Sequence, residues 1–174
     1  MCHFILTILP PKANVAAIEA LYGQYKRNLK PADADKRIMP WMEGNEFCYW
    51  TTGEVCDCGT ALLSQDIDYY SSHNNDSEVA KRIKKLRKEG WSQRKIDNWL
   101  SQKMGVREKK QQENAKDRGR WYSLLHEILK QRLSPYLCLL VLWDDKETVI
   151  KGRIKKKLSP DFAPLEENTI YTFS

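Results

Sequence analysis

Three cysteines in the first third of the chain are close enough in sequence to share one metal ion. A single residue separates Cys56 from Cys58, and Cys48 lies eight residues before Cys56. Zinc in structural sites takes four thiolate or imidazole ligands in a tetrahedron, so three thiols leave one ligand to be supplied. The start of the chain offers a thiol and an imidazole for that place. The hypothesis is a structural zinc site drawn from Cys48, Cys56, Cys58, His3 and Cys2.

The segment that must position these thiols, residues 47–59, is typical of a β-hairpin. Strand side chains alternate between faces, so the register decides which thiols meet. If the turn centres on Gly53, Cys48 lies opposite Cys58 and all three thiols share one face. If the loop is Gly53-Glu54, Cys48 points to the other face. In the simpler alternative, Cys48 fills the core and the other two cysteines are ordinary thiols.

An enzymatic alternative uses the same group as a thiol- or zinc-dependent catalyst built on Cys2, His3, Cys56 and Cys58. Removal of Met1 would place the amine of Cys2 beside its own thiol, where it could act as a base. The first two residues are similar to those of class II glutamine amidotransferases. However, His3 stands where that family has glycine, and the later motifs of the family are missing from the sequence. A non-catalytic cysteine at the end of a strand is therefore the preferred interpretation.

The length and apolar content of the chain predict one soluble domain, residues 1–174. The longest apolar run, Tyr136–Trp143, has eight residues, against the ~20 needed to cross a bilayer. The apolar N-terminal stretch has no preceding Lys or Arg and ends at Pro10-Pro11, so it predicts a strand and not a signal peptide. We therefore expect no membrane partner, a cytoplasmic location and reduced cysteines.

The positive charge of the chain is concentrated in its middle. Residues 76–133 contain 17 Lys and Arg against 8 Asp and Glu, a net charge of +9. The first 75 residues carry −3 and the last 41 carry zero, which accounts for the total of +6. Apolar residues at helical spacing run through this segment, and Ser92 is a candidate N-cap within it. We predict a basic helical insertion at residues 76–133, whose stripe from Trp121 to Leu133 faces a core.

A dense array of Lys and Arg attracts phosphate backbones through counterion release. The predicted partner is therefore nucleic acid or an acidic protein surface, such as a toxin that this chain neutralises. The alternative is a solvated helical hairpin whose lysines only keep it soluble. The residues expected to bind the partner are Lys81, Arg82, Lys84, Lys85, Lys88, Arg94, Lys95, Lys109 and Lys110.

Strand-like and helix-like segments alternate around the insertion. A helix is expected at residues 14–29, with Asn14 as its N-cap. Asp144-Asp145-Lys146 is expected to form a hairpin connection between the third and fourth strands. These elements predict an α+β fold, with a mixed or antiparallel sheet of about five strands packed on helices. The expected strands are residues 4–9, 46–52, 136–143, 148–154 and 169–173.

Three segments of the sequence together resemble a group of small, uncharacterised bacterial proteins. They are Met1-Cys2-His3-Phe4, the stretch Tyr49–Thr60 with its Cys-Asp-Cys-Gly-Thr run, and Gly90-Trp91-Ser92 with Lys95-Ile96 and Trp99-Leu100. The resemblance implies a bacterial, cytosolic setting and brings neither an activity nor ligand residues. The sequence as a whole favours a non-enzymatic binding protein with a basic helical arm and a zinc site.

Overall fold

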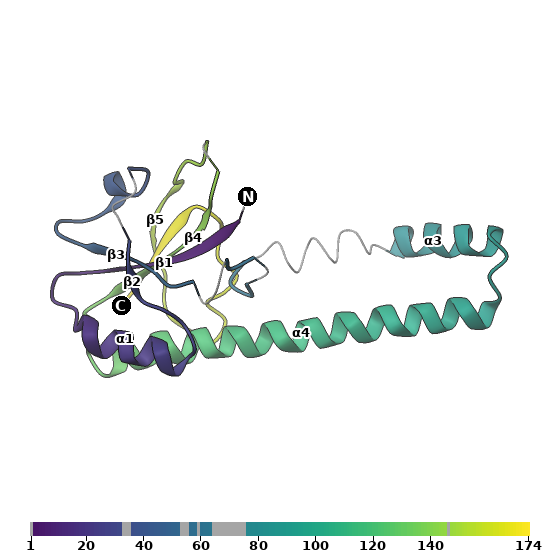
Figure 1. Cartoon of the computed structure of the whole chain (residues 1–174), viewed down its shortest axis with the longest axis horizontal. Coiled ribbons are helices and arrows are strands. Elements are labelled where there is room, and N and C mark those ends of the chain that lie inside the picture. Colours follow the sequence, from purple (N-terminus) through teal and green to yellow (C-terminus); the bar gives the residue numbers. More distant parts are fainter. Residues whose placement is uncertain (1, 33–35, 53–55, 59, 64–75, 146) are drawn as a thin grey trace.

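The computed structural model describes the chain except for residues 1, 33–35, 53–55, 59, 64–75 and 146. The described residues form an α+β fold with a mixed six-stranded sheet in the order β2-β3-β1-β4-β6-β5 (Figure 1). The strands are β1 (His3–Leu9), β2 (Lys30–Pro31), β3 (Phe47–Trp50), β4 (Leu137–Trp143), β5 (Gly152–Lys155) and β6 (Thr169–Phe173). The helices are α1 (Val15–Gln24), α3 (Asp76–Lys88) and α4 (Gln93–Lys130), with a 3-10 turn at Met39–Trp41. The predicted fold class and mid-chain helices are confirmed, with six strands instead of about five.

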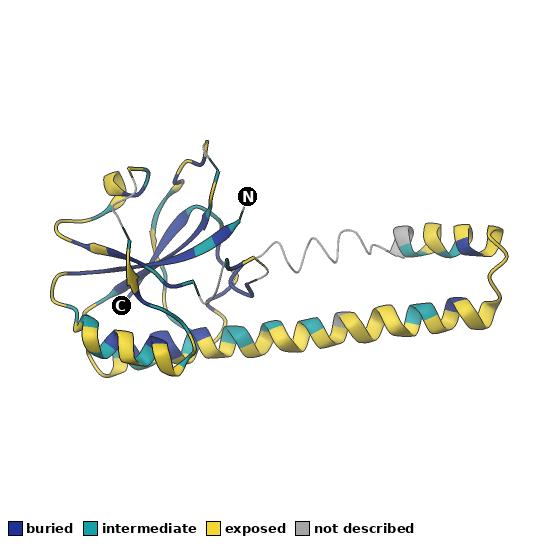
Figure 2. Ribbon diagram, in the orientation of Figure 1, coloured by how far each residue is buried: buried dark blue, intermediate teal, exposed yellow. Residues whose placement is uncertain are grey.

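β1 and β4 form the centre of the sheet because both strands are apolar on both faces. They pair antiparallel, with Leu6 opposite Leu140, and the run Leu137–Leu142 is buried throughout (Figure 2). On one face, Ile5 and its neighbours pack with α1 and the C-terminal end of α4. On the other face, Leu6 and Leu140 lie in a second apolar core with Ile38 and Cys48. The sheet is therefore covered on both sides.

A buried ion pair closes the second face of the sheet. Arg153 on β5 donates from Nη1 and Nη2 to the carboxylate of Glu46, at 2.7 and 2.8 Å, and the hydroxyl of Tyr136 donates to the same carboxylate at 2.7 Å. Burial opposes ionisation of Glu46, but the hydrogen bonds from Arg153, the Glu43 amide and Tyr136 outweigh it and lower the pKa of this carboxyl. Burial raises the pKa of the nearby Cys138 to about 11, so this thiol stays protonated. The pair therefore ties β5 to the segment before β3.

Two predicted hairpins are wrong, and both fail for the same reason. β3 has β1 on one edge and β2 on the other, so residues 56–58 have no free edge of β3 to pair with. The predicted turn at Gly53-Glu54 lies outside the described residues. After Trp143 the chain does not fold back onto β4, because β6 occupies the place beside β4 and β5 pairs parallel to β6. In each case a strand distant in sequence takes the edge that the local turn was expected to fill.

The helix-capping predictions are confirmed. The Asn14 side chain accepts a hydrogen bond from the amide of Ala17, and Ser92 accepts one from the amide of Lys95. α3 ends at Lys88, and Gly90, two residues later, has a φ of +81° that suits the left-handed turn after a helix. α4 then runs for 38 residues without a break. Its last turns, from Trp121 onward, pack in the first core, while the rest extends away from the sheet with α3 alongside it (Figure 1).

Candidate functional site

Three of the five cysteines meet at the start of β1. The sulfur atoms of Cys2, Cys56 and Cys58 all lie within 4.8 Å of one another. The backbone sets this arrangement, because the Asp57 amide donates to the carbonyl of His3 at 2.8 Å and the His3 amide points at the Cys58 sulfur at 3.4 Å. Residues 56–58 are therefore held beside the first residues of β1. This group, called the thiol group below, could hold a metal ion.

Two thiols of the group, Cys56 and Cys58, have pKa values shifted in opposite directions. The backbone amide and the thiol of Cys58 both hydrogen-bond to Cys56 and lower the pKa of Cys56. The His3 amide alone would lower the pKa of Cys58, but the neighbouring Cys56 and Cys2 thiols and partial burial raise it overall. Cys56 is therefore the thiol of this pair that ionises first. Thiolates are the form that binds metal and attacks electrophiles.

The structure does not bring the other two predicted ligands to the thiol group. Cys48 pairs across from Ile8, about 20 Å along β1 from Cys2, and is buried in the second core. His3 is next to the group, but its Nε2 atom lies 2.8 Å from a carboxylate oxygen of Glu167. Its ring also packs 4.4 Å from the ring of Trp143. Neither ring nitrogen of His3 belongs to the set of ligand atoms that lie within 4.8 Å of one another.

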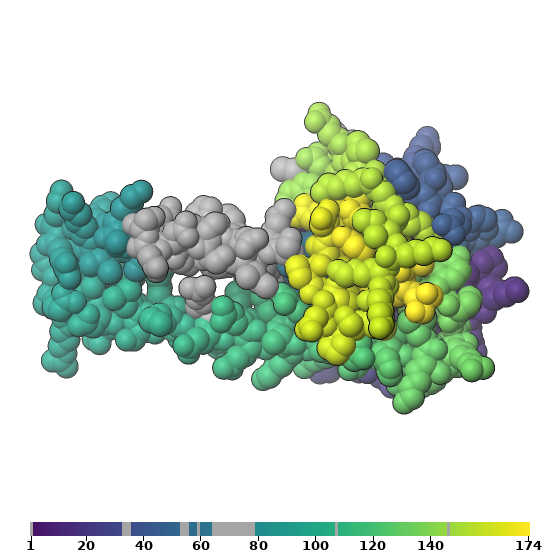
Figure 3. Space-filling model, turned by 180° about the vertical axis from the view of Figure 1, so that it is seen from behind, coloured from purple at the N-terminus to yellow at the C-terminus, as the bar shows by residue number. Residues whose placement is uncertain are grey.

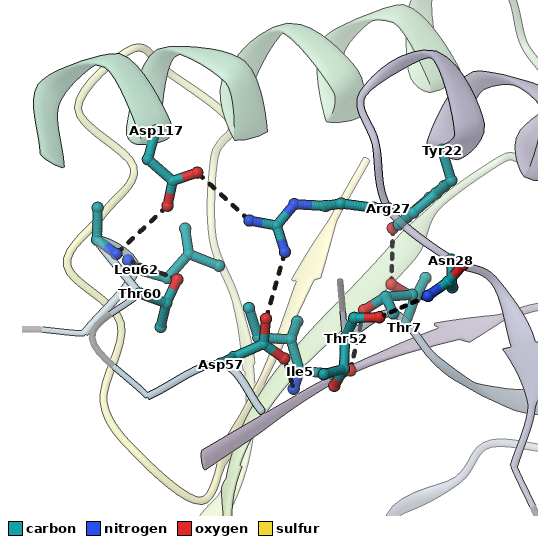
Figure 4. Close-up of polar contacts among 12 residues, drawn as sticks. Ile5, Thr7, Tyr22, Arg27, Asn28, Thr52, Asp57, Thr60, Leu62 and Asp117 are labelled. Atoms are coloured by element: carbon teal, nitrogen blue, oxygen red, sulfur yellow. Dashed lines mark hydrogen bonds and ion pairs between the residues drawn. The ribbon is translucent and has the colours of Figure 1, made fainter. Parts of the chain in front are cut away.

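An ion-pair network joins Asp57, the residue between Cys56 and Cys58, to α4 (Figure 4). The Asp57 carboxylate accepts from the Ile5 amide at 2.9 Å and from Arg27 at 3.4 Å. The same guanidinium donates to Asp117 of α4 at 3.3 Å and lies 3.9 Å above the ring of Trp121. Sequence reasoning missed this network because Arg27 lies 30 residues from one acid and 90 from the other. The one sign of the network in the sequence is Asp57, an acid between two cysteines.

A cleft of about 520 Å³ opens beside this network. Cys56 lines it, together with Asp57, Asp117, Lys26 and Arg120. Both acids already contact Arg27, whereas Lys26 and Arg120 are exposed and form no ion pair with any described residue. The cleft therefore has an excess of positive charge, and one member of the thiol group lies on its wall.

The predicted partner-binding residues lie far from the thiol group, on α3 and on the part of α4 up to Lys116, together called the arm. The apolar side of α3 turns inward, where Leu86 and Ile96 are each only 1 % exposed. Its basic side chains consequently point to solvent. Lys110 is half-buried, and the predicted residues that are exposed are Lys81, Arg82, Lys84, Lys85, Lys88, Arg94, Lys95 and Lys109.

The exposed charges of the arm have few internal partners among the described residues. Lys85 lies 4.0 Å from Glu89, at the limit of an ion pair, and Arg87 donates to Gln93. In the space-filling view, the teal atoms of α3 and of the first part of α4 lie at the opposite end of the molecule from the yellow atoms of the C-terminal strand β6 (Figure 3). A large partner can therefore approach the arm without meeting the sheet.

No protein-family model, curated protein or solved structure matches this chain at a significant level. None of the helices in the described ranges is both long and apolar enough to cross a membrane. The thiol group, the cleft and the arm are therefore the features of the molecule that bear on its function.

Proposed function

We propose that this chain is a non-enzymatic binding protein that presents its arm to the phosphate backbone of nucleic acid. The observation that carries the proposal is the outward display of Lys and Arg on α3, whose apolar side is already covered by α4. Phosphates bind such arrays with little base specificity, because the affinity comes from releasing counterions. The rest of the protein, namely the sheet with α1 and the C-terminal end of α4, is called the body. In this proposal the body holds the end of α4 from which the arm projects.

The surface of α3 favours nucleic acid over an acidic protein. Protein–protein interfaces have an apolar or aromatic centre ringed by polar groups. Among the described side chains of α3, no large apolar residue is exposed, since Ile83 is half-buried and Leu86 is buried. The exposed face of α3 therefore suits a charged polymer. The exposed apolar side chains of the arm lie outside α3, at Met104 and Val106 of α4 and at Trp91 between the two helices. An acidic protein, including a toxin that the chain neutralises, is the alternative occupant.

The thiol group has a separate role in this proposal, as a structural zinc site. Zinc bound by Cys2, Cys56 and Cys58 would fix the start of β1 to residues 56–58. Through Asp57, that segment is connected to Arg27 and so to α4. The second candidate function is a thiol- or zinc-dependent enzyme using Cys2, His3, Cys56 and Cys58. The position of Cys56 on the wall of the cleft is the observation that favours it.

The test is the affinity of the protein for a fluorescent random-sequence DNA duplex, measured by anisotropy over a series of NaCl concentrations. We expect the logarithm of the affinity to fall linearly with the logarithm of salt concentration. Charge reversal at Lys84, Lys85 and Lys88 together should abolish binding and leave no salt dependence. The control reverses Lys12, Lys151 and Lys157, which are exposed on the body and change the net charge equally.

Equal loss of binding in both triple variants would show that net charge alone is responsible and would contradict a role for the arm. Unchanged binding by the arm variant would also remove the proposal. If the wild-type protein ignores DNA and RNA but binds polyglutamate through the arm, the acidic-protein alternative replaces it. Circular dichroism of each variant confirms that the helices are retained.

A further inference from the structure

We infer that the thiol group is an open metal centre, in which three protein thiolates bind the ion and a small anion from solvent supplies the fourth ligand. The inference rests on the proposed zinc site and names what completes it. Sequence reasoning assigned the fourth position to a residue of the chain. The contacts around the thiol group point instead to an exchangeable position that opens on the cleft.

The sulfur positions suit a single thiophilic ion. Two thiolates at a Zn–S distance of ~2.3 Å in a tetrahedron lie about 3.8 Å apart. The three sulfurs are already within 4.8 Å of one another, and none of the three side chains is fully buried. Rotations about the side-chain bonds therefore bring all three onto one ion without moving β1. The group has the donor set of a zinc centre with one ligand missing.

The nearest donors in the described part of the chain are committed to other contacts. His3 contacts Glu167 through Nε2, and neither of its ring nitrogens is among the ligand atoms that lie within 4.8 Å of one another. Both oxygens of the Asp57 carboxylate accept hydrogen bonds, from the Ile5 amide and from Arg27. The remaining thiols, Cys48 and Cys138, are buried in the second core. Recruiting Asp57 would disturb its contacts to Ile5 and Arg27, and recruiting His3 would require its ring to move toward the sulfurs. A ligand from solvent requires neither change.

The cleft determines from which side a ligand from solvent reaches the metal ion. The charges that line the cleft determine which charge that ligand should have. Cys56 is shared by the thiol group and the cleft, so an ion on its sulfur is next to the cleft. Arg27 neutralises the two acids there, while Lys26 and Arg120 remain available. Zinc sites that hold three protein ligands and keep the fourth position for water or substrate are those that exchange ligands. The site is therefore suited to a small anion such as a carboxylate or thiolate.

Cobalt(II) in place of zinc makes the coordination visible. The full-length protein, loaded with one equivalent of cobalt under anaerobic conditions, should show thiolate-to-metal charge transfer and the intense visible bands of a tetrahedral ion. Azide, used as the probe anion, should shift the visible bands saturably and leave the charge-transfer intensity unchanged. That result means that the fourth ligand exchanges while three thiolates stay bound.

Matched variants locate the centre and the anion. Single serine substitutions at Cys2, Cys56 and Cys58 should each reduce the charge-transfer intensity. Cys48→Ser and His3→Ala should leave both this intensity and the visible bands unchanged. Replacing both Lys26 and Arg120 with Gln should weaken azide binding at least about fivefold at low salt, since one nearby charge contributes on the order of 1 kcal/mol. Lys12→Gln is the control for general charge.

The outcomes separate this inference from the zinc site on which it rests. Cobalt binding with visible bands that azide does not move would show a fourth ligand from the chain, overturning the open position alone. Visible bands that shift in His3→Ala would identify His3 as that ligand. Failure of the wild-type protein to bind cobalt or zinc would overturn both the inference and the zinc site, while leaving the arm as proposed.

Discussion

The charged residues of the body and those of the arm make opposite kinds of contact. In the body, Glu46 and Arg153 form a two-pronged ion pair in which the Glu46 side chain is wholly buried. Arg27 likewise contacts acids from two different segments. On the arm, Lys84 and Lys88 are exposed, and neither forms an ion pair with a described residue.

This difference separates charge used for folding from charge left for binding. A buried ion must be paired, because removing one partner leaves the other in a medium that solvates it poorly. Exposed lysines contribute little to stability. Under the proposed function, the many exposed lysines on α3 serve an external partner and not the fold. The predictions below test that division through stability first and binding last.

The largest expected effect comes from breaking the buried pair of the body. Glu46→Ala should lower the free energy of unfolding by about 3–5 kcal/mol, because the Arg153 guanidinium loses its bidentate partner. Urea denaturation followed by tryptophan fluorescence measures it. Glu43→Ala is the control, since its side chain is 70 % exposed and lies 3.5 Å from Arg153. A loss no larger than that of the control would show that this pair does not hold the second face.

The same pair predicts how stability depends on pH. The folded pKa of Glu46 is below its usual value of 4.5, so its stabilising contribution is complete above that value. The contribution is lost as the pH falls through the folded pKa. The stability difference between the wild type and Glu46→Gln should therefore be constant from about pH 7 to 5 and shrink in more acidic solution. A difference that grew on acidification would contradict the assigned direction.

A smaller loss is expected at the junction of body and arm. Arg27→Ala should lower the free energy of unfolding by about 1–3 kcal/mol, because Asp57 and Asp117 lose a shared donor and the ring of Trp121 loses its cover. The neighbouring Lys26 is exposed and unpaired among described residues, so Lys26→Ala should change stability by less than ~0.5 kcal/mol. Equal effects of the two substitutions would show that the contacts of Arg27 with Asp57, Asp117 and Trp121 do not stabilise the fold.

The smallest effect on stability is expected on the arm. Replacing Lys81, Lys84 and Lys95 with Gln should change the free energy of unfolding by no more than about 0.5 kcal/mol per site, as for other exposed residues. The same variant should bind DNA more weakly and with a shallower salt dependence, by about one unit of slope for each lost phosphate contact. Substantial destabilisation without any change in DNA binding would show that these lysines serve the fold and not a partner.

The elements and caps were predictable from sequence because their signals are local. Asn14 and Ser92 cap their helices as expected, and the apolar run at residues 136–143 predicted the central strand β4. The order of the strands was not predictable in the same way. Pairing between β3 and β1, or between β4 and β6, joins segments far apart in sequence, and no turn residue specifies such an edge.

The candidate site shows the same limit. Cys2, Cys56 and Cys58 were recognised from residue type and spacing, and the structure brings their sulfurs together. Cys48 was grouped with them through a local hairpin that does not form, because β2 and β1 occupy both edges of β3. The ion pair between Glu46 and Arg153 spans 107 residues, and neither partner lies in a motif that indicates the other.

The central claim is that the arm, and not the body, binds nucleic acid, and lysine footprinting tests it most directly. The protein is acetylated briefly with and without a saturating DNA duplex, and each lysine is quantified by mass spectrometry. We predict protection of Lys84, Lys85 and Lys88 on α3, with unchanged reactivity at Lys12 and Lys151 on the body. Protection of the body lysines with no protection on α3 would contradict the account.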